Sequence, residues 1–207
     1  NDFFESFFEE HLQKNPQELA ARVIREERGF YHVLIPGNEK NYLAQVSSKI
    51  MKSASGREDF PAVGDWVTTS SPTSSEDRLR ISSVLPRTSC LMRKAAGSGQ
   101  EMQIFATNIN EVFIVTSCNL DFNEKRLDRA LALVHSSKAR PRILLSKIDL
   151  LSNDEILKLQ ERIHTRFPGI DCHAFSMKTG QGMPEILELL ESAKTYVVIG
   201  SSGVGKS

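Results

Sequence analysis

The sequence predicts a protein of mixed α and β structure, in which a small N-terminal β-barrel precedes an α/β domain built on a parallel sheet. Three observations lead to this prediction. Short strand-like runs separated by turn residues fill positions 20–94. Apolar strands alternate with amphipathic helices over 104–207. Between them, residues 95–103 begin with the Gly- and Ser-containing composition of a linker.

Residues 1–19 are predicted to form a separate acidic helix, because they hold five acidic residues and one basic residue. Large apolar side chains recur there at helical spacing, at Phe3, Phe4, Phe7, Phe8 and Leu12. This stripe either packs on the protein's own surface or docks on a partner.

Four runs in the N-terminal domain have the aromatic and β-branched composition of strands, at 30–35, 42–46, 66–69 and 79–85. Pro36-Gly37-Asn38 supplies a turn after the first run, and residues 70–77 are expected to form an exposed loop. Four or five short strands in this length favour a barrel of the oligonucleotide/oligosaccharide-binding (OB) type, although other small barrels fit equally well.

The C-terminal domain shows apolar strands at 112–116, 143–145, 172–175 and 196–199, and helices at 124–136, 154–167 and 184–190. Right-handed crossovers between such strands produce a parallel sheet covered on both faces. Ligands of such sheets bind beyond the carboxyl ends of the strands, so the residues that follow each strand are the candidates for a binding site.

A complete G-x-x-x-x-G-K-S phosphate loop follows the last strand, as Gly200, Ser201, Ser202, Gly203, Val204, Gly205, Lys206 and Ser207. Its backbone N–H groups are expected to surround phosphate oxygens. Lys206 would neutralise the β- and γ-phosphates and the transition-state charge, and the Ser207 hydroxyl would bind Mg²⁺. A Gly/Ser-rich tail is the alternative, which the position directly after an apolar strand disfavours.

Two motifs follow the second and third strands. Ser146-Lys147-Ile148-Asp149 resembles the N/T-K-x-D guanine motif, in which Asp149 accepts both N1–H and N2–H₂ of guanine and the lysine stem covers the base. The alternative is a solvated helix start with Asp149 as its cap. Ser176-Met177-Lys178 resembles the S-A-K loop, whose backbone N–H reaches guanine O6.

The order of these motifs is unusual for a GTPase, because the two guanine motifs precede the phosphate loop. A parallel sheet keeps the same site if the original termini are joined and the chain is opened elsewhere. The sequence therefore predicts a circularly permuted P-loop GTPase domain.

Composition is consistent with a cytoplasmic globular protein. The chain has 207 residues, 40% of them hydrophobic and 25% charged, with a formal net charge of +0. Its three cysteines form no C-x-x-C pair, which argues against disulfides and a zinc site within this chain. No apolar run approaches the ~20 residues of a membrane span, and the N-terminus lacks the features of a signal peptide.

Several further motifs strengthen the resemblance to one family, the circularly permuted, ribosome-associated GTPases called ribosome small-subunit-dependent GTPase A. They are Val63-Gly64-Asp65-Trp66-Val67, Val84-Leu85-Pro86-Arg87-Thr88-Ser89, Asn108-Ile109-Asn110-Glu111-Val112 and Phe122-Asn123-Glu124-Lys125-Arg126-Leu127-Asp128-Arg129. With the three nucleotide motifs, the resemblance runs from about Arg22 to Ser207.

The resemblance implies an OB domain that binds ribosomal RNA and protein, and a GTPase, using Mg²⁺ with GTP, that acts in late maturation of the small (30S) ribosomal subunit and is stimulated by it. It also implies a C-terminal zinc-binding domain, which is absent from this chain. We expect a monomer without membrane contact. The candidate RNA contacts are basic residues of the barrel, each of which fits a solvated face equally well, at Arg78, Arg80, Arg87, Arg93 and Lys94.

The chain departs from the family pattern in two ways. Ser146 stands where the motif has Asn or Thr, so guanine selectivity should rest more on Asp149. The sequence also stops at Ser207, before the following helix and switch regions, so this fragment is expected to hydrolyse GTP poorly. The alternative function is a non-hydrolysing, nucleotide-sensing RNA-binding module.

Overall fold

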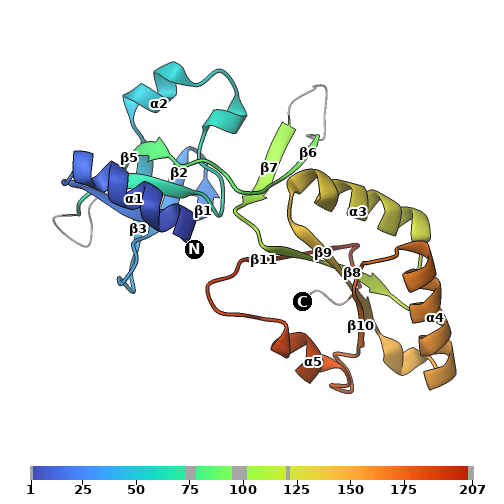
Figure 1. Ribbon diagram of the computed structural model, residues 1–207. Helices are drawn as coiled ribbons and strands as arrows, with labels where there is room; N and C mark the ends of the chain where they lie inside the picture. Colours follow the sequence, from blue (N-terminus) through green and yellow to red (C-terminus); the bar gives the residue numbers. More distant parts are fainter. Residues whose placement is uncertain (1, 73–77, 95–101, 120–121, 205–207) are drawn as a thin grey trace. The chain divides into compact units, whose positions relative to one another are not determined.

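The computed structural model describes residues 2–72, 78–94, 102–119 and 122–204, with side chains from Phe8 onward and without that of Lys94. The chain divides into two compact units, Asn1–Asn108 and Ile109–Ser207 (Figure 1). This division lies a few residues after the predicted one. Of the predicted linker, 95–101 lie outside the described residues. Residues 102–103 instead belong to a strand of the first unit.

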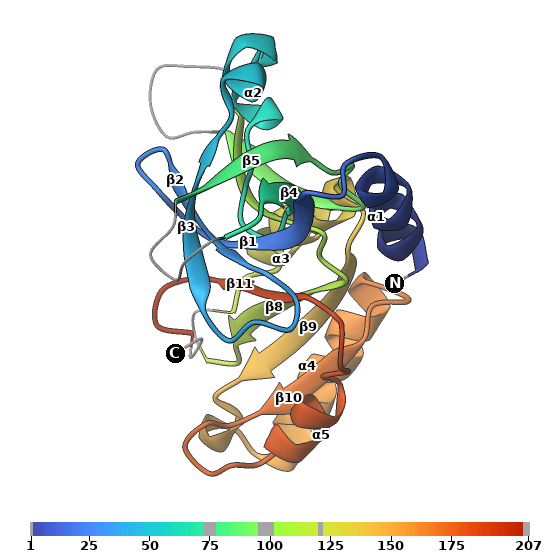
Figure 2. The ribbon, with the colours of Figure 1, turned by 90° about the vertical axis from the view of Figure 1, so that its left-hand side faces the viewer.

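Five strands close the N-terminal barrel (Figure 2): β1 (Glu18–Glu27), β2 (Phe30–Leu34), β3 (Asn41–Val46), β4 (Trp66–Ser70) and β5 (Arg78–Val84). They are joined in the order β1-β2-β3-β5-β4. All neighbours are antiparallel except β3 and β5, which are parallel. Val33, Val67 and Ile81 are fully buried inside. The predicted barrel is therefore present, although β1 was not identified as a strand from its alanines and charged residues.

Three elements accompany the barrel without having been predicted. The helix α2 (Ser48–Ser53), capped by the Ser47 side chain, and a 3₁₀ helix (Arg57–Asp59) connect β3 with β4. A hairpin of β6 (Cys90–Lys94) and β7 (Met102–Thr107) follows β5. Of the loop predicted at 70–77, Ser70 ends β4 and residues 73–77 lie outside the described residues.

The N-terminal helix α1 (Asp2–Lys14) packs on its own protein through Phe8. The Phe8 ring meets Trp66 of β4 edge-on, with 5.7 Å between ring centroids. His11 also lies 3.0 Å from the Glu18 carboxylate of β1. These contacts favour the packing alternative over partner docking for this part of the stripe. The side chains of Phe3, Phe4 and Phe7 lie outside the described part of the structure.

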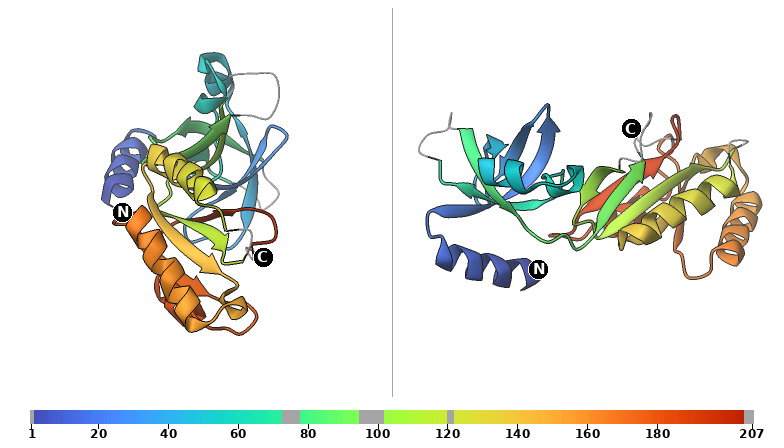
Figure 3. Two further views of the ribbon diagram at one scale, coloured as in Figure 1. Left: turned by 90° about the vertical axis from the view of Figure 1, so that its right-hand side faces the viewer. Right: turned by 90° about the horizontal axis from the view of Figure 1, so that it is seen from above.

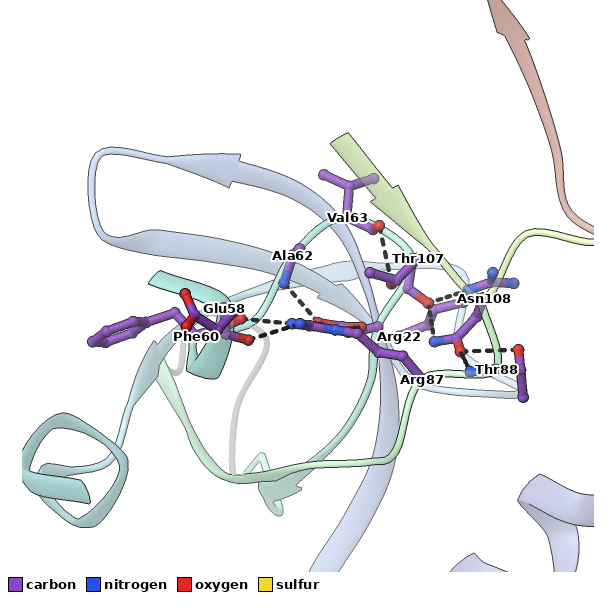
Figure 4. A network of polar contacts seen from close by, with 11 residues as sticks. Arg22, Glu58, Phe60, Ala62, Val63, Arg87, Thr88, Thr107 and Asn108 are labelled. Carbon is purple, nitrogen blue, oxygen red and sulfur yellow. Dashed lines mark hydrogen bonds and ion pairs between the residues drawn. The ribbon is translucent and has the colours of Figure 1, made fainter. Parts of the chain in front are cut away.

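A buried ion pair joins two of the sequence motifs in this unit. The Asp65 side chain is fully buried and receives Arg87 Nη2 at 2.7 Å and Nε at 2.9 Å (Figure 4). Arg87 also donates to the Glu58 and Phe60 carbonyls. Its guanidinium is therefore engaged inside the domain. With these donors engaged, Arg87 has few N–H groups left for a phosphate, which disfavours its predicted contact with RNA.

Asn108 connects a third motif to the same region. Its amide nitrogen donates to the Gly64 carbonyl at 3.0 Å, and its amide oxygen accepts from the Thr88 N–H at 2.9 Å (Figure 4). Gly64 has φ +95°, and a Cβ there would lie 2.3 Å from the Thr107 carbonyl oxygen. The glycine is thus required for close packing of two backbone segments.

The second unit contains a four-stranded parallel sheet in the order β10-β9-β8-β11 (Figure 3). Its strands are β8 (Glu111–Ser117), β9 (Arg140–Ser146), β10 (Cys172–Phe175) and β11 (Tyr196–Gly200), and its helices are α3 (Glu124–Ser137), α4 (Asn153–Arg166) and α5 (Met183–Glu188). Every predicted strand and helix of this domain is present within a few residues. The parallel sheet is confirmed.

The helices lie on both faces of the sheet. Contacts place α3 against β8 and β9, and α4 against β10. The helix α5 lies on the opposite face (Figure 1). Its Ile186 packs there with Phe113, Val115 and Leu144 of the sheet and with Val204. No helix in the described part of the chain is long and apolar enough to cross a bilayer.

Replacing Arg87 by alanine should destabilise the barrel unit by about 3 kcal/mol, because the Asp65 carboxylate would stay buried without its guanidinium partner. Trp66 is the only tryptophan of the sequence and lies in β4, so its fluorescence during urea unfolding reports this unit.

Arg80→Ala is the matched control. Arg80 is exposed, so its loss should change the stability by no more than about 0.5 kcal/mol. Equal effects of the two substitutions would show that the ion pair does not stabilise the unit.

Candidate functional site

The carboxyl ends of the strands in the second unit lie in register at one edge of the sheet. Ser117 at the end of β8 pairs with Ser146 at the end of β9, and Ser146 pairs with Phe175 at the end of β10. Gly200 at the end of β11 pairs with Val115. The three loops that follow β9, β10 and β11 therefore begin at the same edge of the sheet, although more than 50 residues separate the first from the last.

A hydrogen bond joins the two loops that resemble guanine motifs. The buried Ser176 hydroxyl donates to Asp149 Oδ1 at 2.6 Å. The same hydroxyl oxygen accepts the N–H groups of Lys178 and Thr179, both at 3.2 Å. Ser176 thereby fixes its own loop and orients the Asp149 carboxylate. Oδ1 keeps a second lone pair, and within the described part of the chain Oδ2 accepts no hydrogen bond, so both oxygens can accept from a ligand.

These loops enclose a cavity of about 340 Å³, lined by Ser146, Lys147, Asp149, Leu150, Met177, Lys178 and Val204. Lys147 has the left-handed backbone conformation, with φ 64°. Within the described part of the chain, the Met177 N–H has no hydrogen-bond acceptor. The cavity thus offers a carboxylate, a free backbone donor and a long alkyl stem, the groups needed to read the edge of a purine and cover its face.

Asp149 lies in a 3₁₀ helix (Ile148–Leu150), and it does not cap α4. The cap of α4 is Ser152, whose hydroxyl accepts the Glu155 N–H while the Glu155 carboxylate accepts the Ser152 N–H. The alternative of a helix-capping Asp149 is therefore excluded. Its carboxylate faces the loop after β10 instead.

Ser146, which is predicted to contact the base, makes a hydrogen bond inside the protein. Only 2% of the residue is exposed, and its hydroxyl donates to the Val204 carbonyl at 2.5 Å. Val204 belongs to the phosphate loop. The first residue of the motif that resembles the guanine motif therefore ties the end of β9 to the phosphate loop beside the cavity.

The described part of the phosphate loop runs from Gly200 to Val204. Gly200 has no room for a side chain, because a Cβ would lie 2.5 Å from the Val115 carbonyl oxygen. Ser201, Ser202 and Gly203 are exposed, whereas Val204 turns inward and is 6% exposed. Gly205, Lys206 and Ser207, which include the predicted Mg²⁺ ligand, lie outside the described residues.

A second cavity of about 340 Å³ lies between the start of the phosphate loop and α3, with Gly200, Ser201, Arg126 and Arg129 in its lining. The acidic residues of α3 face α4 instead, where Glu124 and Asp128 pair with Arg162 and Arg166. The flank of α3 beside the loop is left with positive charge.

The remaining basic candidates belong to the first unit. Arg78, Arg80 and Arg93 are exposed. The Arg93 guanidinium lies 4.3 Å from the centroid of the Phe105 ring, which is 40% exposed. The Lys94 side chain is outside the described part of the structure.

Cys118 belongs to this site, although it is not among the site residues predicted from the sequence. It directly follows β8, and its Sγ lies 2.9 Å from the Lys147 carbonyl oxygen. Burial raises the pKa of this thiol, and the Asp149 charge adds to the effect. The rule that singled out the residues after the other strands would also have identified Cys118.

Comparison with known proteins agrees with the fold and the motif order. The family model described as RsgA GTPase matches residues 84–207. A Lactiplantibacillus plantarum protein named small ribosomal subunit biogenesis GTPase RsgA 2 is 40% identical over 95% of this chain and 54% of its own length. An Oceanobacillus iheyensis protein named small ribosomal subunit biogenesis GTPase RsgA 1 is 39% identical over 92% of this chain and 53% of its own length. The chain thus spans about half the length of these curated relatives.

Two solved structures share the fold. The crystal structure of YjeQ from Thermotoga maritima has a TM-score of 0.73 at 22% identity, covering 92% of this chain and 63% of its own. YloQ, described as a circularly permuted GTPase, has a TM-score of 0.68 at 25% identity, covering 91% of this chain and 61% of its own. The predicted fold class, a barrel followed by a circularly permuted GTPase domain, is confirmed.

Two glycines in the loop after β10 offer a matched test of its geometry. Gly182 has φ +74°, and a Cβ there would lie 2.0 Å from the Ala174 carbonyl oxygen of β10. Gly180 has φ +78° but open space around it. Gly182→Ala should therefore destabilise the second unit by about 3 kcal/mol, and Gly180→Ala by about 1 kcal/mol. Calorimetric unfolding of both variants measures the difference, and equal losses would contradict the close packing at Gly182.

Proposed function

The chain belongs to the RsgA GTPase family, and we propose that its protein binds and hydrolyses GTP in the late maturation of the small ribosomal subunit. Two hydrogen bonds beside one cavity carry this proposal. One joins Ser176 to Asp149 and the other joins Ser146 to Val204, so they connect the two motifs that resemble guanine motifs and the phosphate loop. The names of the relatives supply the ribosomal context.

Base recognition follows from the groups in the cavity. The Asp149 carboxylate, oriented by Ser176, accepts N1–H and N2–H₂ of guanine, while the Met177 N–H donates to O6. Adenine presents the opposite pattern at this edge, so it would leave these groups unpaired in a partly buried site. The alkyl stems of Lys147 and Lys178, which line the cavity, cover the faces of the base.

The phosphates extend from this pocket toward Gly200–Ser207. The backbone N–H groups of the loop bind phosphate oxygens, and Lys206 neutralises the charge that develops during transfer. Mg²⁺ prefers hard oxygen ligands, which fits the Ser207 hydroxyl of the G-K-S sequence. When bound, the ion would neutralise phosphate charge. Arg126 and Arg129 beside Gly200 raise the positive potential at this end of the site.

The barrel would bring the protein to its ribosomal partner. Arg78, Arg80 and Arg93 are exposed there, and Arg93 with Phe105 offers a cation and an aromatic face of the kind that binds RNA. We propose that these residues contact rRNA of the small subunit and that the protein acts as a cytoplasmic monomer.

Asp149→Asn tests the base assignment in the full-length protein. The amide loses one acceptor and gains a donor, which suits xanthine, because xanthine has a carbonyl in place of the 2-amino group. The variant should bind GDP about 100-fold more weakly and XDP more tightly than the wild type does. Asp154→Asn, on the exposed first turn of α4, should leave both affinities unchanged. An Asp149→Asn variant with wild-type GDP binding would exclude Asp149 from the base pocket.

Phosphate release from GTP, measured with and without purified small ribosomal subunits, tests the activity itself. We expect the subunits to raise turnover by the wild type, and Asp149→Asn to transfer the stimulated turnover from GTP to XTP. If the protein binds GTP but the subunits never raise its turnover, it is a nucleotide-sensing binding module and not a subunit-stimulated GTPase.

A further inference from the structure

Cys118 makes two hydrogen bonds to the guanine loop from a neighbouring strand. It is 6% exposed, and its backbone N–H donates to the Ser146 carbonyl at 3.0 Å. Its thiol lies 2.9 Å from the next carbonyl, that of Lys147. One residue directly after β8 therefore holds two consecutive peptide groups at the start of the segment that carries Asp149.

The Lys147 carbonyl accepts two hydrogen bonds, one from within this loop and one from Cys118. Lys147 adopts the left-handed conformation, which is uncommon for a residue with a side chain, and so the peptide after it needs support. The Leu150 N–H donates to the same carbonyl at 3.1 Å, closing the short turn around Asp149. The thiol occupies the second lone pair. The Leu150 N–H thus holds the turn from within, and the Cys118 thiol holds it from the neighbouring segment after β8.

The Cys118 thiol is protonated, so it can donate a hydrogen bond, and it forms no disulfide. Burial raises its pKa, so it remains protonated at neutral pH. All three cysteines are free, so Cys118 is not consumed by a disulfide.

We propose that Cys118 is a positioning residue for guanine recognition: its S–H bond to the Lys147 carbonyl holds the turn in which the Asp149 carboxylate meets both donors of the base. The inference rests on the proposed guanine-nucleotide function. It predicts an effect on selectivity, because a bidentate contact depends on the orientation of the carboxylate more strongly than a single hydrogen bond does.

Inosine diphosphate is the probe that separates positioning from general loosening of the pocket. IDP has the N1–H and O6 groups of GDP but lacks the 2-amino group, so it can make only one of the two contacts with Asp149. A loose pocket would weaken both nucleotides equally. A rotated or mobile Asp149 would weaken GDP more than IDP and lower the ratio of the two affinities.

The experiment measures GDP and IDP binding to the full-length protein by titration calorimetry. Cys118→Val fills the space without a donor, Cys118→Ala removes the donor and bulk, and Cys118→Ser keeps a hydroxyl donor. We expect valine and alanine each to lower the GDP-to-IDP affinity ratio by about fivefold, the effect of one hydrogen bond. Serine should keep the ratio within about twofold of the wild type. Cys172→Val is the matched control. Cys172 is the first residue of β10, at the end of the strand away from the Ser176 loop, so this substitution should leave the GDP-to-IDP affinity ratio unchanged.

The two proposals fail in different ways. If the wild type prefers GDP and both Cys118→Val and Cys118→Ala retain that preference, the positioning role is wrong while the guanine assignment stands. A serine variant that loses as much selectivity as valine would also contradict the role of the donor. A wild-type protein that binds GDP no better than IDP would overturn the guanine assignment, and with it this inference.

Discussion

The hydrogen bond from the Ser146 hydroxyl to the Val204 carbonyl is the contact on which the site depends. It joins the last residue of β9 to the loop after β11, and it forms because the parallel sheet aligns the ends of these strands. Ser176 adds the loop after β10 through its bond to Asp149. Three loops far apart in sequence thereby enclose one cavity. Circular permutation preserves this arrangement, because strand order in the sheet, and not order along the chain, decides which loops meet.

The first unit depends on a comparable polar contact. Asp65 and Arg87 lie 22 residues apart, and their ion pair connects the segment before β4 with the segment after β5. The guanidinium further binds two carbonyls near the 3₁₀ helix, so one side chain satisfies acceptors from separate loops. This requirement keeps Arg87 inside the domain. Arg78, Arg80 and Arg93, by contrast, are exposed on the barrel and the hairpin.

Regular hydrophobic periodicity made much of the fold predictable. Strands such as 112–116 and 172–175 and the helix at 124–136 follow from their apolar spacing, and the phosphate loop follows from its glycines and lysine. Side-chain contacts over long sequence separations were not predictable. The sequence does not show that Arg87 pairs with Asp65, 22 residues away. It also does not show that the Ser146 hydroxyl donates to the Val204 carbonyl. Cys118 was missed because a buried thiol carries no sequence signal beyond its position after a strand.

A crystal structure of the full-length protein with GDP and Mg²⁺ would test the central claim most directly. We expect guanine N1 and N2 to lie within hydrogen-bond distance of Asp149, O6 to lie beside the Met177 N–H, and the diphosphate to lie in the Gly200–Ser207 loop. A structure in which the loop holds the phosphates while the base lies outside the cavity between Lys147 and Met177 would contradict it.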